Sequence, residues 1–244
     1  MQQQTDTCTS GFGQPIGWAV PDWAPCARPA DTPMVGRFCR VEPYAREQHL
    51  EGLFESYAAD DGRMWTYLPW GPFADPAGLE QLMVFTKDLF QRFAIISSAS
   101  GLPVGSASYM RHAPDAGSIE VGAVTFSPHL RRTPAATEAM YLMMRRAFET
   151  GYRRYEWKCD SLNAPSRAAA LRLGFRYEGV FRQERVIKGR NRDTAWFSVI
   201  DSEWPQLRRA MERWLEPANF DPAGRQRTAL SRMIEDERNV GDGG

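Results

Sequence analysis

Residues 118–139 read S-I-E-V-G-A-V-T-F-S-P-H-L-R-R-T-P-A-A-T-E-A, and more of the fold follows from them than from any other segment. The first half has the composition of a strand, whereas apolar residues recur at three- and four-residue intervals after the second arginine, as they do in a helix. Thr133 is a natural N-cap, and Pro134 suits the first helical position, where a missing N–H costs nothing. We therefore expect a strand that leads into a long helix.

The loop between that strand and that helix carries two arginines, Arg131 and Arg132. The free N–H groups and the positive dipole end of a helix attract anions, and a guanidinium binds phosphate in a bidentate manner. Ala135 and Ala136 keep the approach to the helix open. The loop therefore indicates a diphosphate site, although a capped structural helix with solvated arginines would show the same residues.

A second informative segment is S-L-N-A-P-S-R-A-A-A-L-R-L-G-F, residues 161–175. It follows the pattern R-Y-E-W-K-C-D at residues 154–160, which predicts a strand. Asn163 and Ser166 suit the head of a short helix, and Gly174 suits its end. The second segment thus repeats the order of a strand followed by a helix.

The remaining elements alternate between strand and helix patterns, which predicts a mixed α/β fold. Residues 36–42 indicate a first strand, residues 44–58 a first helix, and Asp75 followed by Pro76 starts a second helix that runs to about residue 90. An antiparallel meander follows, and further strands and a last amphipathic helix complete the order. The meander strands are expected at residues 93–98, 104–110 and 118–126, the later strands at 175–186 and 194–200, and the last helix at 204–215.

Three parts of the chain differ in composition. Residues 1–33 are rich in Gly, Pro, Thr and Gln and indicate an irregular N-terminal arm that is docked by its tryptophans. Residues 34–216 carry the strand and helix patterns and form the expected domain. Residues 217–244 are polar, end in G-D-G-G and predict a disordered C-terminal tail.

Charge and cysteine content exclude several classes of function. The 30 Lys and Arg residues balance the 30 Asp and Glu residues, so no global field favours nucleic acid or an anionic membrane. No signal peptide or membrane span is evident, so we expect a cytoplasmic protein. The cysteines are scattered without metal-binding or disulfide spacing, and no metal is expected. They are Cys8, Cys26, Cys39 and Cys159.

Together the two segments resemble the cofactor-binding motifs of GNAT acyltransferases, most closely those of the RimJ/RimL-type branch. The motifs are E-V-G-A-V-T-F-S-P, R-R-T-P-A-A-T-E-A and N-A-P-S ahead of L-G-F, and the resemblance covers about residues 36–215. It implies the GNAT fold, which has a mixed, mostly antiparallel central sheet with splayed central strands and flanking helices. It also implies acetyl-CoA as co-substrate and an amine as acceptor.

The resemblance assigns the cofactor residues one by one. The backbone of Val124, Thr125 and Phe126 would hold pantetheine between the splayed strands, and Asn163 and Ser166 would lie near the amide or thioester end. The diphosphate would lie on the loop and first helical turn formed by Arg131, Arg132, Thr133, Pro134, Ala135 and Ala136. Pro134 stands where the family usually has Gly, which removes one backbone donor.

Two residues are candidates for proton transfer. The family often has a Tyr as proton donor where this chain has Ala170, and Ser166, three residues after Asn163, is the substitute that the RimJ/RimL-type branch suggests. Ser166 could instead be a helix-capping hydroxyl. Glu120 is the candidate base, acting through a water on the ammonium of the acceptor, and an exposed cross-strand charge is its alternative. Cys159 is expected to fill the core.

The loop between the first two helices contains carboxylates and aromatic rings, as an acceptor site for a cationic amine would. A hydrophobic wedge over the core or a homodimer contact would explain the aromatics equally well. The candidate acceptor residues are Asp60, Asp61, Trp65, Tyr67 and Trp70. The histidines show no metal or triad spacing and are expected at the surface or in turns. They are His49, His112 and His129.

The sequence therefore predicts an acetyl-CoA-dependent N-acetyltransferase that modifies a primary amine by direct attack. The acceptor could be a protein or peptide N-terminus or a small molecule. The replacements at Pro134 and Ala170 leave a catalytically silent acyl-CoA-binding module as the main alternative. A non-enzymatic interaction protein that keeps the fold is the third possibility.

Overall fold

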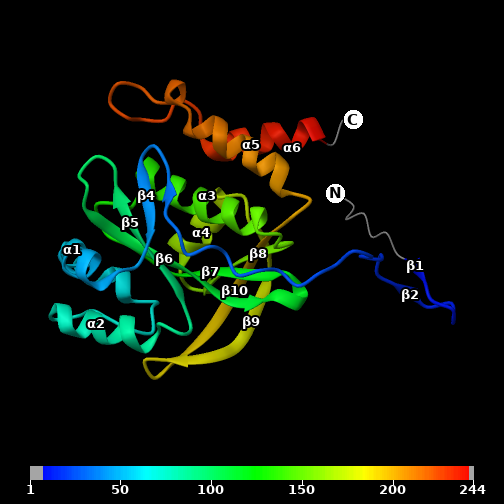
Figure 1. Ribbon diagram of the computed structural model, residues 1–244, viewed down its shortest axis with the longest axis horizontal. Helices are drawn as coiled ribbons and strands as arrows, with labels where there is room; N and C mark the ends of the chain where they lie inside the picture. Colours follow the sequence, from blue (N-terminus) through cyan, green and yellow to red (C-terminus); the bar gives the residue numbers. More distant parts are fainter. Residues whose placement is uncertain (1–7, 242–244) are drawn as a thin grey trace.

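An eight-stranded sheet runs through the part of the chain that the computed structural model describes, residues 8–241 (Figure 1). Its strand order is β3-β4-β5-β6-β7-β8-β10-β9. Neighbouring strands are antiparallel except for β7 and β8, which are parallel. The strands are β3 Met34–Val35, β4 Cys39–Pro43, β5 Gln91–Ser97, β6 Pro103–Ala113, β7 Ser118–Phe126, β8 Arg154–Asp160, β9 Arg176–Ile187 and β10 Arg190–Ile200. The expected mixed, mostly antiparallel sheet is confirmed.

The parallel strands β7 and β8 pair over only part of their length. Their register joins Ser118 to Arg154 and ends where Val121 meets Trp157. Beyond that point β8 stays paired with β10, and β7 stays paired with β6 across a bulge at Ala123, which has a φ of 48°. The far half of β7 therefore has a neighbouring strand on one side only, which is the splay that the GNAT resemblance implied.

Helices cover both faces of the sheet (Figure 1). One cluster of buried side chains joins α1 and α2 to β5 through Ala94 and Ile96, whereas the intervening Ile95 belongs to the larger cluster under α3. Alternate residues of one strand thus enter different cores, as strand geometry requires. The helices are α1 Arg46–Ala58, α2 Pro76–Phe85, α3 Pro134–Glu149, α4 Ala164–Arg172, α5 Trp204–Leu215 and α6 Leu230–Gly241, with short 3-10 turns at Arg63–Trp65, Pro114–Ala116 and Pro217–Asn219.

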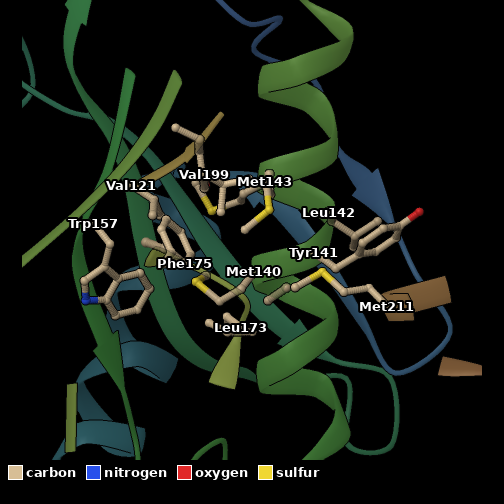
Figure 2. Close-up of a cluster of buried hydrophobic side chains, with 14 of the residues drawn as sticks. Val121, Met140, Tyr141, Leu142, Met143, Trp157, Leu173, Phe175, Val199 and Met211 are labelled. Atoms are coloured by element: carbon tan, nitrogen blue, oxygen red, sulfur yellow. The ribbon is translucent and has the colours of Figure 1, made fainter. Parts of the chain in front are cut away.

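The long helix α3 is buried on two sides. Figure 2 shows Met140 and Met143 on the side that faces Phe175 and the sheet, and Tyr141 on the side that faces Met211 of α5. The helix is anchored further by Glu138, whose carboxylate accepts the backbone N–H groups of residues 37–39 at 2.6–2.9 Å. The N-terminus of α3 is therefore fixed relative to the sheet.

The N-terminal arm departs in part from the expectation. Trp23 docks on the domain, because its Nε1 donates to the carbonyl of Asp115 at 2.8 Å, but Trp18 is 54% exposed. Strands β1 Cys8–Thr9 and β2 Pro15–Ile16 form a small hairpin that projects from the domain (Figure 1). Residues 1–7 of the arm lie outside the described residues.

The C-terminal segment contains a helix, which corrects the expectation of a disordered tail over residues 217–244. Leu230, Met233 and Ile234 recur at helical spacing and are buried against the domain, and Glu237 pairs with arginines of α5 at 2.8 Å. The helix was not predicted because its few apolar residues lie among many charged ones. Residues 242–244 lie outside the described part of the chain.

Two smaller boundaries also differ from the expectation. Helix α2 ends at Phe85 rather than near residue 90, because Thr86 acts as the C-cap and turns follow. The strand expected at residues 36–42 is β4, which begins at Cys39, and the two-residue strand β3 comes before it. Within residues 8–241 no helix is long and apolar enough to cross a membrane, and no cluster of potential metal ligands occurs.

Candidate active site

A cavity of about 190 Å³ opens where β7 and β8 separate. Its walls come from β7 between Glu120 and Val124, the end of β8, the start of α4, the loop after α1, and the β9–β10 hairpin. The β7 wall spans the point after Val121 at which pairing with β8 ends. Of the expected pantetheine residues Val124 lines the cavity, while Thr125 and Phe126 continue β7 beside it and pair with Ser106 and Gly105.

Glu120 forms part of a buried charge cluster on this wall. Its side chain is 8% exposed, and its Oε2 lies 3.1 Å from Lys158 Nζ and 3.6 Å from Arg111 Nε. Lys158 Nζ also lies 2.8 Å from Glu156 and 3.5 Å from the centre of the Trp196 ring. Glu120 is thus buried and paired, in contrast to the exposed cross-strand charge considered as its alternative.

The two carboxylates of the cluster respond differently to burial. Burial raises the pKa of Glu120, and the nearby Lys158 opposes that rise only in part. Burial would also raise the pKa of Glu156, but bonds from Lys158 and Arg154 outweigh it and hold that pKa below its usual range. Within residues 8–241, Glu120 Oε2 and Lys158 Nζ are buried and have no partner that meets hydrogen-bond geometry, so their contact is an ion pair. A carboxylate with a raised pKa at a cavity wall is suited to accept a proton.

Ser166 lies on the opposite wall of the cavity, in the first turn of α4. Trp157 Nε1 donates to Ser166 Oγ at 3.0 Å, and a hydroxyl that accepts one hydrogen bond can still donate its own proton. The cap of α4 is provided by Asn163, whose Oδ1 accepts the Ser166 N–H at 3.1 Å. The Ser166 hydroxyl therefore does not cap this helix, and Asn163 lines the cavity beside it.

The loop before α3 has the features of an anion site. Thr133 is the N-cap and accepts the N–H of Ala136 at 3.4 Å, while Pro134 and Ala135 open the helix. Arg131 and Arg132 are exposed, and Arg132 adopts a left-handed φ of 62°, which non-glycine residues rarely do. Arg131 donates to the nearly buried carboxylate of Asp60, which joins this loop to the loop after α1.

The five expected acceptor residues divide into two groups. Tyr67 and Trp70 line the cavity. Trp65 is instead 4% exposed and packs edge-on against Tyr57 and Phe73, so its ring belongs to the core. Asp60 accepts the N–H groups of Gly62 and Met64 as well as the Arg131 guanidinium, and Asp61 pairs with Arg63 at 2.9 Å.

The loop after α1 is held by a lysine from the β9–β10 hairpin. Lys188, at the tip of the β9–β10 hairpin, donates through Nζ to the carbonyls of Trp65 at 2.9 Å, Gly71 at 3.1 Å and Trp70 at 3.3 Å. One ammonium thus joins three points of residues 65–71. This contact joins the loop to the hairpin.

The geometry agrees with what known proteins show. A model of the acetyltransferase (GNAT) domain family matches residues 40–176. A GCN5-related N-acetyltransferase from Brucella melitensis is 44% identical over 88% of this chain and 100% of its own, with a TM-score of 0.86. A probable GNAT-family acetyltransferase from Chromobacterium violaceum is 38% identical over 79% of this chain and 98% of its own, with a TM-score of 0.74.

The chain belongs to the GNAT acetyltransferase family. It is therefore an acetyl-CoA-dependent acyltransferase, and the expectation of an enzyme is confirmed. The fold is also shared with a more distant protein, RimJ from Mycobacterium smegmatis solved in complex with CoA-disulfide, at 19% identity over 68% of this chain and 84% of that one, with a TM-score of 0.56. A comparison with curated proteins finds no match.

The residues of this GNAT acetyltransferase fit acetyl-CoA. The unpaired edge of β7 after Gly122 leaves backbone groups free on the side of the splay, as an extended amide chain such as pantetheine requires. The N-terminus of α3 and the exposed Arg131 and Arg132 suit a diphosphate. Pro134 removes one donor from that loop, and the two guanidinium groups supply others.

Several residues at the cavity of this acetyltransferase were not singled out from the sequence. Lys158 lies between Trp157 and Cys159 in the central strand β8. A charged residue in such a strand is costly to bury, and this could have marked Lys158 as a candidate site residue. Arg111, Arg185 and Arg192 also line the cavity, but they come from three different strands, and no sequence motif joins them.

The cysteine and the histidines have ordinary roles, with one correction. Burial raises the pKa of Cys159, which favours the unreactive thiol and agrees with a core position. His49 is buried rather than at the surface, because its Nδ1 accepts the N–H of Ala45 at the start of α1 and its Nε2 lies 3.4 Å from Glu42. His129 is exposed, and His112 is partly buried.

Proposed function

We propose that this enzyme transfers the acetyl group of acetyl-CoA to a primary amine by direct attack, without an acyl-enzyme. The observation that carries the proposal is the buried Glu120 at the splay of β7 and β8, with its raised pKa and its ion pair to Lys158. Acetyl-CoA, when bound, supplies an acyl group activated as a thioester. An amine acceptor must lose a proton before or during attack, since its pKa is roughly 8 at a chain terminus and about 10.4 on lysine.

The residues of the chain divide the proton transfers between them. Glu120 accepts the proton of the incoming ammonium, directly or through a water, and Lys158 favours the ionised form of the carboxylate. Ser166, whose oxygen is oriented by Trp157, donates its hydroxyl proton to the departing thiolate and regains a proton from solvent. Val124, Thr125 and Phe126 hold pantetheine, and the loop from Arg131 to Ala136 holds the diphosphate.

The acceptor enters between the loop after α1 and the β9–β10 hairpin. Tyr67 and Trp70 supply aromatic surface there, whereas Asp60 and Trp65 are engaged elsewhere and act indirectly, by shaping the loop. A RimJ/RimL-like acceptor, the N-terminus of a protein or peptide, is part of the proposal. The motifs N-A-P-S and R-R-T-P-A-A and the shared fold of the M. smegmatis RimJ support it.

Thiol release from acetyl-CoA tests the proposal, measured with a panel of peptides, polyamines and amino sugars. We expect release that depends on the amine and a mass increase of one acetyl group on that amine. Calorimetric titration with acetyl-CoA is run beside it. Binding of acetyl-CoA without transfer to any member of the panel would favour a silent acyl-CoA-binding module, to which the replacements at Pro134 and Ala170 also point.

A further inference from the structure

Two arginines face each other directly across the strands β9 and β10. Arg185 is the register partner of Arg192, and both line the cavity that contains Glu120 and Ser166. Like charges at directly opposed positions of an antiparallel pair destabilise the sheet. A repulsive pair at the wall of a cavity is thus a position where a bound anion would stabilise the protein.

Nearby carboxylates compensate the charge of this pair only weakly. The oxygen of Glu184 that pairs with Arg185 is 3.9 Å away, and Arg192 forms no ion pair within residues 8–241, since its Nε donates to Thr194 Oγ1 at 3.2 Å. Asp193 is engaged by the N–H of Gln183 and by Asn191. Asp160 and Glu184 also line the cavity, but neither forms a short contact with these guanidinium groups.

A third arginine reaches the same cavity from β6. Arg111 has a left-handed φ of 46°, and its Nε lies 3.6 Å from Glu120 Oε2 while its guanidinium lies 5.8 Å from the centre of the Trp196 ring. Half of its side chain is exposed, so it can contact both the buried carboxylate and a ligand. The cavity therefore combines one buried carboxylate with several accessible guanidinium groups.

We propose that the amine acceptor carries an anionic group, which Arg185 and Arg192 bind while its ammonium meets Glu120. This inference rests on the proposed function and names the class of its acceptor, a zwitterionic amine with a carboxylate near the amino group. The fork of a guanidinium matches such a group and forms charge-assisted hydrogen bonds with it. Binding of the anion also removes the repulsion between the two arginines.

Matched pairs of amines test the proposal by changing only the charge of the second group. L-Alanine is compared with L-alaninamide, and the amidated dipeptide Asp-Ala with amidated Asn-Ala, so that a free α-carboxylate and an acidic side chain are scored separately. We expect kcat/KM to be about tenfold or more higher for the anionic member of at least one pair. Binding of each amine to the protein loaded with CoA is measured by calorimetry, so that the preference is scored without turnover.

The variant R185Q/R192Q should abolish that preference, because kcat/KM for the anionic member should fall to the value for the neutral member. Its melting temperature should not fall, because the substitution removes a repulsive pair. Arg190→Gln, on the same hairpin but outside the cavity, should behave as the unmodified enzyme does. Equal kcat/KM and equal binding within both pairs would overturn the inference while leaving the proposed function intact. Loss of amine-dependent thiol release with every amine would instead overturn the proposed function, and calorimetry would still score the anion preference.

Discussion

The proposed cofactor side and the proposed acceptor side of the cavity are built in different ways. The cofactor side comes from β7, the loop before α3 and the start of α4, where two short sequence motifs supply backbone groups and arginines. The acceptor side comes from the loop after α1, one end of β6 and the β9–β10 hairpin, which are far apart in the chain. Long side chains such as Lys188 join its parts. Local backbone geometry thus defines one side, and long-range side-chain contacts define the other.

Glu120 lies where the two sides meet, and its substitution should lower kcat more than any other change described below. Glu120→Gln keeps the shape of the side chain but cannot accept a proton, so kcat should fall about 10²- to 10⁴-fold. The affinity for acetyl-CoA, measured by calorimetry, should be unchanged, and Lys158 keeps its pairing with Glu156. A kcat near that of the unmodified enzyme would show that Glu120 is not the base.

Ser166 tests whether the cofactor side also supplies chemistry. Ser166→Ala should lower kcat about 10- to 100-fold, because a thiolate is a fair leaving group and needs only limited assistance. Acetyl-CoA affinity should remain, although the melting temperature should fall slightly, since Trp157 Nε1 loses its acceptor. Ser166→Thr retains the hydroxyl and should recover part of the activity. Full turnover in Ser166→Ala together with a lowered melting temperature would leave the hydroxyl a purely structural role.

Arg131 joins the two sides through Asp60, and a pair of variants separates its roles. Arg131→Glu reverses the charge beside the expected diphosphate and should raise the KM for acetyl-CoA about tenfold or more. Asp60→Asn can still accept the N–H groups of Gly62 and Met64 but frees Arg131, so that KM should not rise. If both variants raised the KM equally, the effect would come from the loop and not from the diphosphate.

Lys188 contacts the acceptor side alone, and its substitution should change the kinetic constants least. Lys188→Met removes the contacts to the carbonyls of Trp65, Trp70 and Gly71, which loosens the acceptor loop. We expect the KM for the amine to rise about three- to tenfold and the KM for acetyl-CoA to stay constant, as measured in steady-state kinetics. Lys87→Met, at an exposed lysine, is the matched control. A change in both KM values would indicate a wider rearrangement of the fold.

The cofactor side could be predicted from the sequence because its signals are local. A capping Thr133 followed by Pro134, and the strand pattern ahead of them, define β7 and α3, and both appear at the expected residues. The same applies to Arg154–Asp160, which forms β8 as expected. Helix ends that lack such signals could not be predicted correctly. Residues 86–90 contain no glycine or proline to indicate that α2 ends at Phe85.

The acceptor side could be predicted only in part, because packing decides which aromatic residues face the cavity. Trp65 and Trp70 are tryptophans of the same loop, and nothing in the sequence distinguishes them. In the structure Trp65 packs in the core against Phe73 and Tyr57, whereas Trp70 lines the cavity. The opposition of Arg185 and Arg192 depends on the register of β9 and β10, which includes a bulge. Such features follow from tertiary contacts and not from spacing along the chain.

The pH dependence of kcat/KM in the unmodified enzyme and in Lys158→Met tests the central role of the Glu120–Lys158 pair. Burial raises the pKa of Glu120 and Lys158 lowers it, so removal of the ammonium should raise that pKa further. Since the base must be deprotonated, we predict that the acidic limb of the profile moves to higher pH in Lys158→Met. Circular dichroism over the same pH range would establish that the variant is folded. The same acidic limb in both folded proteins would contradict the account.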